Sequence, residues 1–253
     1  MIKTFDNANN WVVDFKPNPQ AKLQLICFHY AGGGTSIFRT WSDYLPTDIK
    51  VCAIRLPGRE TRFKEPLLTH MDCIIQSLIY PLLTILDKPF AFFGHSMGAL
   101  ISFELARLLR NNYSLTPQHL FVSSCCAPQL MDSNPPIYNL PESKFVEKLC
   151  EFNGIPQAVL EDKELMQIFL PIFRADFSVL ETYCYRPHQP LNCSITAFGG
   201  MQDSLVSFSQ LEAWQAQTNE SFSLQRFPGN HFFLNPAKVS LLASISKILH
   251  EFL

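Results

Sequence analysis

Short apolar runs alternate along the chain with longer segments in which apolar residues recur at helical spacing. Most of the short runs are continuously apolar, which is typical of strands buried on both faces of a parallel sheet. Strands are predicted at residues 23–29, 51–56, 89–94, 119–124, 193–199 and 223–229. Helices are predicted at residues 70–86, 98–112, 210–218 and 237–253. This alternation predicts an α/β fold with a mostly parallel central sheet flanked by helices.

One segment interrupts the alternation. After a proline-rich stretch (SNPPIYNLP), residues from about 132 to 190 carry helical patterns at 144–155 and 164–185 with no strand between them. The apolar residues of these patterns exceed the single stripe that a helix needs to pack on a core, so a second apolar surface remains. We expect one domain over residues 1–253 with this helical insertion. The insertion is either an ordinary extra layer or a lid over a pocket.

Composition limits the classes of partner. With 253 residues, of which 47% are hydrophobic and 17% charged, the chain is long enough to bury one α/β-sized core. It has 20 Lys and Arg against 22 Asp and Glu, a net charge of −2, and no long run of one sign. We therefore do not expect it to bind nucleic acid. No apolar run reaches the ~18 residues of a membrane span, and the first twenty residues do not resemble a signal peptide.

The eight cysteines lie mostly within apolar stretches. They show neither the CxxC spacing of a metal site nor the density of a small disulfide scaffold. We expect reduced, buried thiols in a cytoplasmic protein.

The stretch FGHSMG at residues 93–98 places Gly94 and Gly98 two positions either side of Ser96. It follows a predicted strand and precedes a predicted helix, which is the context that a nucleophile elbow requires. The serine of such an elbow occupies a tight, strained turn, and the glycines leave room where a Cβ would strike the neighbouring strand or helix. The pattern predicts an α/β-hydrolase fold with Ser96 as its nucleophile.

A serine nucleophile needs a base and an acid. His231, in PGNHFFL, lies between the last predicted strand and the final helix, at the sheet edge that carries the elbow. The other six histidines fall in or beside predicted strands and helices, in the elbow, or at the exit of the insertion. Asp203, in GGMQDSLV, completes the order Ser, Asp, His of the α/β-hydrolases. Asp132, after the strand at 119–124, is the alternative acid.

Acyl transfer also requires hydrogen-bond donors for the developing oxyanion. The backbone N–H of Met97, directly after the nucleophile, supplies one. We expect the second from the loop at residues 30–34, with Ala31 as the donor. The glycines of this loop lack the GxGxxG spacing, and no GK[ST] follows them, so a phosphate-binding loop is a weak interpretation.

Together these motifs resemble the type II thioesterases, the stand-alone editing enzymes of polyketide synthases and nonribosomal peptide synthetases, which are of the same kind as the animal medium-chain fatty acid synthase thioesterase. CFHYAGGG, RLPGRE, FGHSMGA, RADF, GGMQD and PGNHFFL occur in family order and cover nearly the whole chain. The family pattern places nucleophile, acid and base on Ser96, Asp203 and His231, and the oxyanion donors on Met97 and Ala31. His29 departs from the pattern, because proline is common there, and this leaves the shape of the loop open.

The resemblance implies hydrolysis of acyl groups from the phosphopantetheine thiol of an acyl or peptidyl carrier protein. It implies no metal and no bound cofactor, since phosphopantetheine belongs to the substrate. The insertion would shape an acyl pocket or form simple core through Phe145, Leu149, Phe169, Phe173 and Phe177. Arg55, Arg59, Arg62 and Lys64, in RLPGRETRFK, would either meet an acidic carrier or lie in a solvated loop. A monomer is expected.

Two other functions use similar sequence features. A free-standing carboxylesterase or lipase would apply the same triad to an oxygen ester, and the family-specific motifs argue against it. A non-catalytic binding protein of the hydrolase fold would lack a functional triad, and the intact triad argues against that. The sequence does not identify the acyl chain or the pathway.

Overall fold

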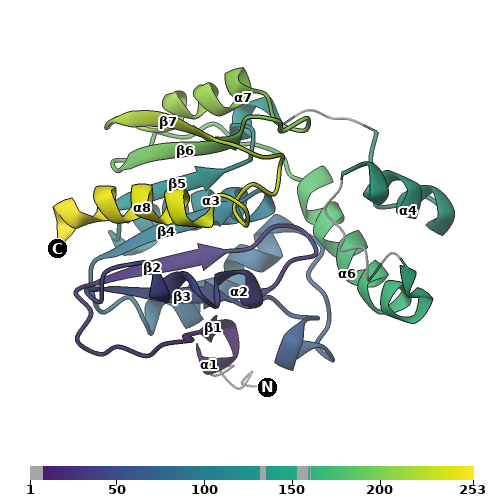
Figure 1. Ribbon diagram of the computed structural model, residues 1–253, viewed down its shortest axis with the longest axis horizontal. Coiled ribbons are helices and arrows are strands. Elements are labelled where there is room, and N and C mark those ends of the chain that lie inside the picture. The colour runs from purple at the N-terminus through teal and green to yellow at the C-terminus, as the bar shows by residue number, and fades with distance from the viewer. Residues whose placement is uncertain (1–7, 132–134, 153–158, 160) are drawn as a thin grey trace.

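A seven-stranded sheet forms the centre of the computed structural model, which describes residues 8–131, 135–152, 159 and 161–253. Its strand order is β1-β3-β2-β4-β5-β6-β7 (Figure 1). Strand β1 runs antiparallel to β3, and all the other neighbouring pairs are parallel. The strands are β1 (Val12–Val13), β2 (Leu23–Phe28), β3 (Ile49–Ile54), β4 (Phe90–His95), β5 (His119–Ser123), β6 (Ser194–Gly200) and β7 (Phe222–Phe227).

Helices cover both faces of this sheet. In β2 the side chains of Leu23, Leu25 and Cys27 pack into the apolar cluster that contains α8. Those of Ile26 and Phe28 pack into the cluster that contains α2 and α3. Burial on both faces explains why the strands read as continuously apolar. The helices are α1 (Ala8–Trp11), α2 (Met71–Leu83), α3 (Met97–Tyr113), α4 (Glu142–Glu151), α6 (Lys163–Glu181), α7 (Phe208–Glu212) and α8 (Lys238–Leu249).

The predicted fold class is confirmed. Each of the six predicted strands is present within two residues of its expected bounds. The sequence did not indicate β1, because two half-buried valines do not make a detectable apolar run. The helix predicted at 210–218 is shorter, since α7 ends at Glu212 and the chain continues as a 3-10 helix over Ala213–Gln217.

The helical insertion contains α4 and α6, and no strand occurs in the part of residues 132–190 that the structure describes. Figure 1 shows both helices to one side of the sheet. They enclose an apolar cluster of their own, which includes Phe145, Leu149 and Phe173 and is separate from the two clusters that flank the sheet. The second apolar surface expected from the sequence is therefore present.

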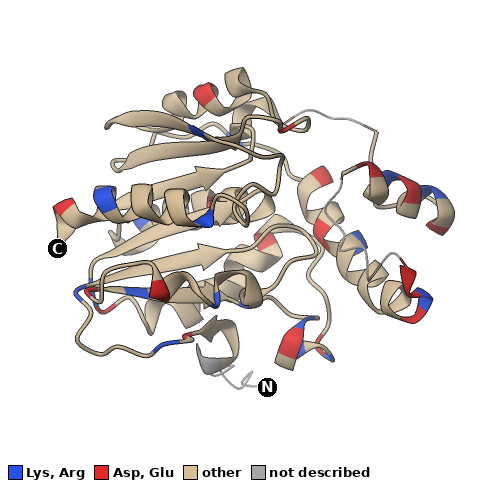
Figure 2. Cartoon of the chain, viewed as in Figure 1, with Lys and Arg blue, Asp and Glu red and all other residues tan. Residues whose placement is uncertain are grey.

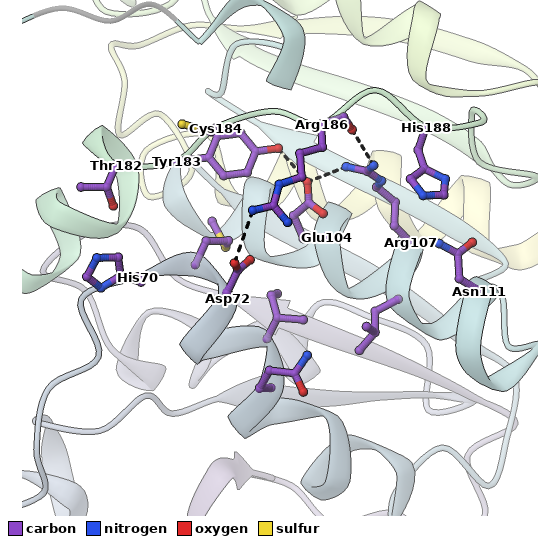
Figure 3. Close-up of a pocket in the computed structure, with 14 residues that line it drawn as sticks. His70, Asp72, Glu104, Arg107, Asn111, Thr182, Tyr183, Cys184, Arg186 and His188 are labelled. Carbon is purple, nitrogen blue, oxygen red and sulfur yellow. Dashed lines mark hydrogen bonds and ion pairs between the residues drawn. The ribbon is translucent and has the colours of Figure 1, made fainter.

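The chain leaves the insertion across α2 and α3, where polar contacts hold it. Tyr183 Oη donates to Glu104 Oε1 at 2.7 Å, and Arg107 donates to the same oxygen at 2.8 Å and to the carbonyl of Arg186 at 2.7 Å (Figure 3). A cavity of about 440 Å³ opens beside these residues. None of the predicted site residues lines it, so it is not the candidate active site.

Charged residues of both signs occur along the chain (Figure 2). Figure 2 shows lysine and arginine interspersed with aspartate and glutamate, on α4 as elsewhere. In the part of the chain that the structure describes, no helix is both long and apolar enough to cross a bilayer.

Candidate active site

Ser96 occupies the turn between β4 and α3 with φ 53° and ψ −117°, a conformation that is strained for serine. The two glycines around it have no room for a side chain. A Cβ on Gly94 would lie 2.2 Å from the carbonyl oxygen of Gly98, and a Cβ on Gly98 would lie 2.2 Å from that of Phe28. The chain has the tight strand–turn–helix geometry of an elbow here, and only glycine fits at the positions two before and two after the strained serine.

Asp203 and His231 lie in the turns that follow β6 and β7 and are hydrogen-bonded. The Nδ1–H of His231 donates to Asp203 Oδ2 at 2.9 Å, and the side chains are 9% and 1% exposed. The other carboxylate oxygen accepts the backbone N–H groups of Leu205 at 2.9 Å and Val206 at 3.2 Å. This arrangement places the proton of a neutral His231 on Nδ1 and leaves Nε2 as an acceptor.

The charge of Asp203 is maintained by these contacts. Burial raises its pKa, but the hydrogen bond and charge of His231 and the amide of Leu205 outweigh burial, so the pKa lies below its ordinary value. Asp203 is therefore ionised at neutral pH. Asp132, the alternative acid, lies outside the described residues.

One cavity of about 220 Å³ brings several predicted site residues together. Ser96, His231 and Ala31 all line it, and Asp203 lies behind His231. Ser96 is partly exposed to the cavity. Because the elbow and the loops after β6 and β7 follow the carboxyl ends of parallel strands, these residues meet at one edge of the sheet.

The two predicted oxyanion donors lie on adjacent segments. Met97 is the first residue of α3, so its N–H has no acceptor within the helix. Gly98 lies against the backbone carbonyls of Phe28 and His29, which brings the start of α3 to the loop after β2. Ala31 is in that loop and lines the cavity.

A buried ion pair that the sequence did not suggest supports this loop. The Arg59 guanidinium donates to both carboxylate oxygens of Asp176, on α6, at 3.0 and 2.9 Å. The Gly32 N–H donates to the same carboxylate at 2.7 Å, and Arg59 also donates to the carbonyl of Gly33 at 3.0 Å. The pair therefore connects the insertion to the loop that carries Ala31.

The expected roles of the basic residues near Arg59 need correction. Arg55, Arg59 and Arg62 are all buried, so they neither form a solvated loop nor present themselves to a carrier protein. Arg62 donates to the carbonyl of Arg55 and lies 3.7 Å from the ring centre of Trp11. Only Lys64 of the four is exposed.

Three of the five predicted substrate-binding residues line the cavity: Leu149, Phe173 and Phe177. Phe145 and Phe169 are not among the lining residues but pack against two of the lining rings. Phe145 packs edge-on against Phe177 with ring centres 5.9 Å apart, and Phe169 packs against Phe173 at 6.3 Å. The remaining apolar lining residues were not predicted from the sequence; they are Cys125, Cys126, Met131, Phe152, Leu180, Leu205, Val206 and Phe232.

Some of these missed residues carried a usable signal. Cys125 and Cys126 come one residue after the end of β5, whose carboxyl end lies at the same sheet edge as the elbow. Among the described residues, no group of three or more His, Cys, Asp and Glu side chains is arranged to hold a metal ion.

Comparison with known proteins identifies the family. The Thioesterase domain family matches residues 23–249. "Gramicidin S biosynthesis protein GrsT" of Aneurinibacillus migulanus is 46% identical over 96% of this chain and 94% of its own length. "Linear gramicidin dehydrogenase LgrE" of Brevibacillus parabrevis is 43% identical over 100% and 97%. The medium-chain S-acyl fatty acid synthase thioesterase of Rattus norvegicus is 36% identical over 86% and 83%.

Comparison with solved structures supports the same family. The type II thioesterase BorB, from the borrelidin biosynthetic cluster, superposes with a TM-score of 0.86 at 33% identity over 94% of this chain and 96% of its own. The matching family, the relatives and the seven-stranded sheet are consistent with one another. The chain therefore belongs to the thioesterase family, as a thioester hydrolase of the type II kind with an α/β-hydrolase fold.

Proposed function

We propose that this thioesterase removes acyl groups from the phosphopantetheine arm of acyl or peptidyl carrier proteins in polyketide, nonribosomal peptide or fatty acid synthesis. The observation that carries the proposal is the hydrogen-bonded pair of Asp203 and His231 on the same cavity as the elbow serine, Ser96. The relatives support the pathway, since GrsT is named for gramicidin S biosynthesis and BorB belongs to a borrelidin cluster.

In this mechanism the Ser96 hydroxyl attacks the thioester carbonyl while His231 Nε2 takes its proton. The ionised Asp203 stabilises the imidazolium that forms. The N–H groups of Met97 and Ala31 stabilise the oxyanion of the tetrahedral intermediate. The carbon–sulfur bond then breaks, and His231 returns the proton to the pantetheine thiolate. A water molecule activated by His231 hydrolyses the acyl-enzyme and restores Ser96.

The lining of the cavity supports the proposal that the cavity binds an apolar acyl group of the substrate. Beyond Ser96, Ser124, His231 and the hydroxyl of Tyr30, its wall is made of hydrophobic side chains and the two cysteine thiols. Helices α4 and α6 supply part of that wall, so the insertion at about 132–190 would act as a lid over the acyl chain. All eight cysteines are free thiols, which supports a reducing compartment such as the cytoplasm. The expectation that they are buried is wrong for Cys73, Cys150 and Cys184, which are exposed.

Two alternatives receive less support. LgrE is named a dehydrogenase, but the glycines of the loop after β2 lack the GxGxxG spacing of a dinucleotide site, so we do not extend that name to this chain. A carboxylesterase would use the same three side chains on an oxygen ester. The geometry of the site does not distinguish a carboxylesterase from a carrier-directed thioesterase. A comparison of kcat/KM on the two kinds of ester does.

The decisive variant for the mechanism is Ser96→Ala. We expect it to fold normally and to lose at least ~10³-fold in kcat on an acyl-pantetheine thioester, because no other group can form the acyl-enzyme. Rapid quenching of the wild-type reaction followed by mass spectrometry should show an acyl adduct on Ser96. Hydrolysis near the wild-type rate by the folded variant would rule out this mechanism.

A further inference from the structure

His29 directly follows β2 and lies one residue before the peptide group that links Tyr30 to Ala31. The sequence left its effect on this loop open, because the family pattern favours proline at this position. In the structure the side chain is 2% exposed and turns back onto the loop. Its Nδ1 lies 2.8 Å from the carbonyl oxygen of Tyr30.

That carbonyl oxygen accepts a second hydrogen bond, from the N–H of Gly33 at 2.9 Å. A peptide group is planar and trans, so the C=O of Tyr30 and the N–H of Ala31 point in opposite directions. Two donors that fix the carbonyl therefore also fix the direction of the Ala31 N–H. Both Tyr30 and Ala31 line the cavity that contains Ser96.

The neighbours of His29 select one protonation state. A carbonyl oxygen only accepts, so Nδ1 must carry the proton. On the other side of the ring, Nε2 lies 3.5 Å from an Arg59 Nη1 nitrogen, which only donates. Burial, and then the charge of Arg59, lowers the pKa of His29 to about 4. The ring is therefore neutral, with its proton aimed at Tyr30, throughout the neutral pH range.

We propose that His29 is a positioning residue of the oxyanion hole: its Nδ1–H holds the Tyr30 carbonyl so that the Ala31 N–H faces the substrate oxygen. The inference rests on the proposed function, in which Ala31 is an oxyanion donor. Proline would make this loop rigid through its fixed φ, and histidine would do so through a hydrogen bond. The side chain does not touch the substrate and acts only through the peptide plane.

Three substitutions test the role of the donor. His29→Phe retains a ring of similar size and removes the N–H. His29→Asn places an amide N–H near the position of Nδ1 and should restore the bond. His119→Phe is a matched control, since His119 is also buried, also has a pKa lowered to about 4 by burial, and bonds Thr196 at 2.9 Å without lining the cavity.

We expect His29→Phe to lower kcat about 10- to 100-fold with KM changed less than about threefold. Complete loss of an oxyanion donor costs about 10²- to 10³-fold, and here the donor is misdirected rather than removed. Affinity for an alkylboronic acid, which forms a tetrahedral adduct on Ser96, should fall by the same factor as kcat. His29→Asn should stay within about threefold of wild type in both measurements, and His119→Phe should change neither.

A folded His29→Phe variant with wild-type kcat and boronate affinity would overturn the inference, as would a His29→Asn variant as impaired as His29→Phe. If His29→Phe does not fold, His29→Gln takes its place, because the Gln amide reaches the Nε2 position instead of Nδ1. Failure of the proposed function would show in the wild-type protein, as thioester hydrolysis that does not depend on Ser96. The two failures are therefore distinguishable.

Discussion

At the scale of single residues, the conformation of Ser96 depends on its immediate neighbours in the chain, whereas the contacts of Arg59 do not. Ser96 is predicted to be the nucleophile because it lies between a strand and a helix with a glycine two positions away on either side, and the structure gives the steric reason for both glycines. Arg59 was misjudged, because a basic residue in a loop is usually solvated. Its partner Asp176 is 117 residues further along the chain, so no local pattern could show the pairing.

Asp203 provides a test at this scale. Replacement by Asn removes the charge that stabilises the protonated His231 and favours the wrong tautomer of the ring, so Asp203→Asn should lower kcat by about 10⁴-fold. Steady-state kinetics on an acyl-pantetheine thioester measures the loss. Asp132→Asn, the alternative acid, should change kcat little, and the reverse ranking of the two variants would move the acid to residue 132.

The same substitution has an effect on stability that depends on pH. The pKa of Asp203 in the folded protein is below its ordinary value of 3.8, so its ionised form stabilises the fold above that pH and this contribution is lost as the pH falls through the folded pKa. At neutral pH the free energy of unfolding, measured by chemical denaturation, should therefore be higher for wild type than for Asp203→Asn. This difference should become smaller as the pH falls into the acid range.

Whole elements were predicted well where both faces of a strand are buried. The insertion shows the limit of this approach, because helical periodicity reveals the apolar stripes of α6 but not which residues along a stripe reach the cavity. Phe177 and Phe169 lie on the same helix and looked equivalent in the sequence. Phe177 lines the cavity, whereas Phe169, eight residues earlier on α6, is not a lining residue and packs against Phe173.

This difference between the two rings predicts a difference in substrate preference. Phe177→Ala removes part of the wall and should shift the chain length with the highest kcat/KM upward by roughly two carbons or more, since the enlarged apolar space accepts further methylene groups. Phe169→Ala is the control, because it shortens a ring of the same apolar cluster away from the cavity. Kinetics on pantetheine thioesters of increasing chain length, with Tm measured for each variant, makes the comparison. An unchanged optimum in a folded Phe177→Ala variant would show that this wall does not contact the acyl chain.

At the scale of the whole molecule, the α/β-hydrolase fold followed from the order of elements together with the elbow motif, whereas the kind of thioester did not. Triad geometry is shared by esterases and thioesterases, so the chemistry of the site does not define the leaving group. The charged residues give no simple indication either, because both signs occur along the chain and the net charge is −2 (Figure 2). Recognition of the carrier has to be measured directly.

A thioester has a good leaving group, so a triad enzyme can hydrolyse small thioesters and activated esters alike. If the carrier is the natural partner, contacts with its surface and with the pantetheine arm, remote from the reacting bond, should help to position the acyl carbonyl. We expect kcat/KM on an acyl carrier protein to exceed that on the same acyl group attached to coenzyme A or a short thiol by at least about tenfold, a difference of about 1.4 kcal/mol. Oxygen esters of matching chain length should be hydrolysed with a still lower kcat/KM. Side-by-side kinetics with a single acyl group decides the matter, because equal rates on carrier and free thiol, combined with faster hydrolysis of the ester, would identify the protein as a carboxylesterase.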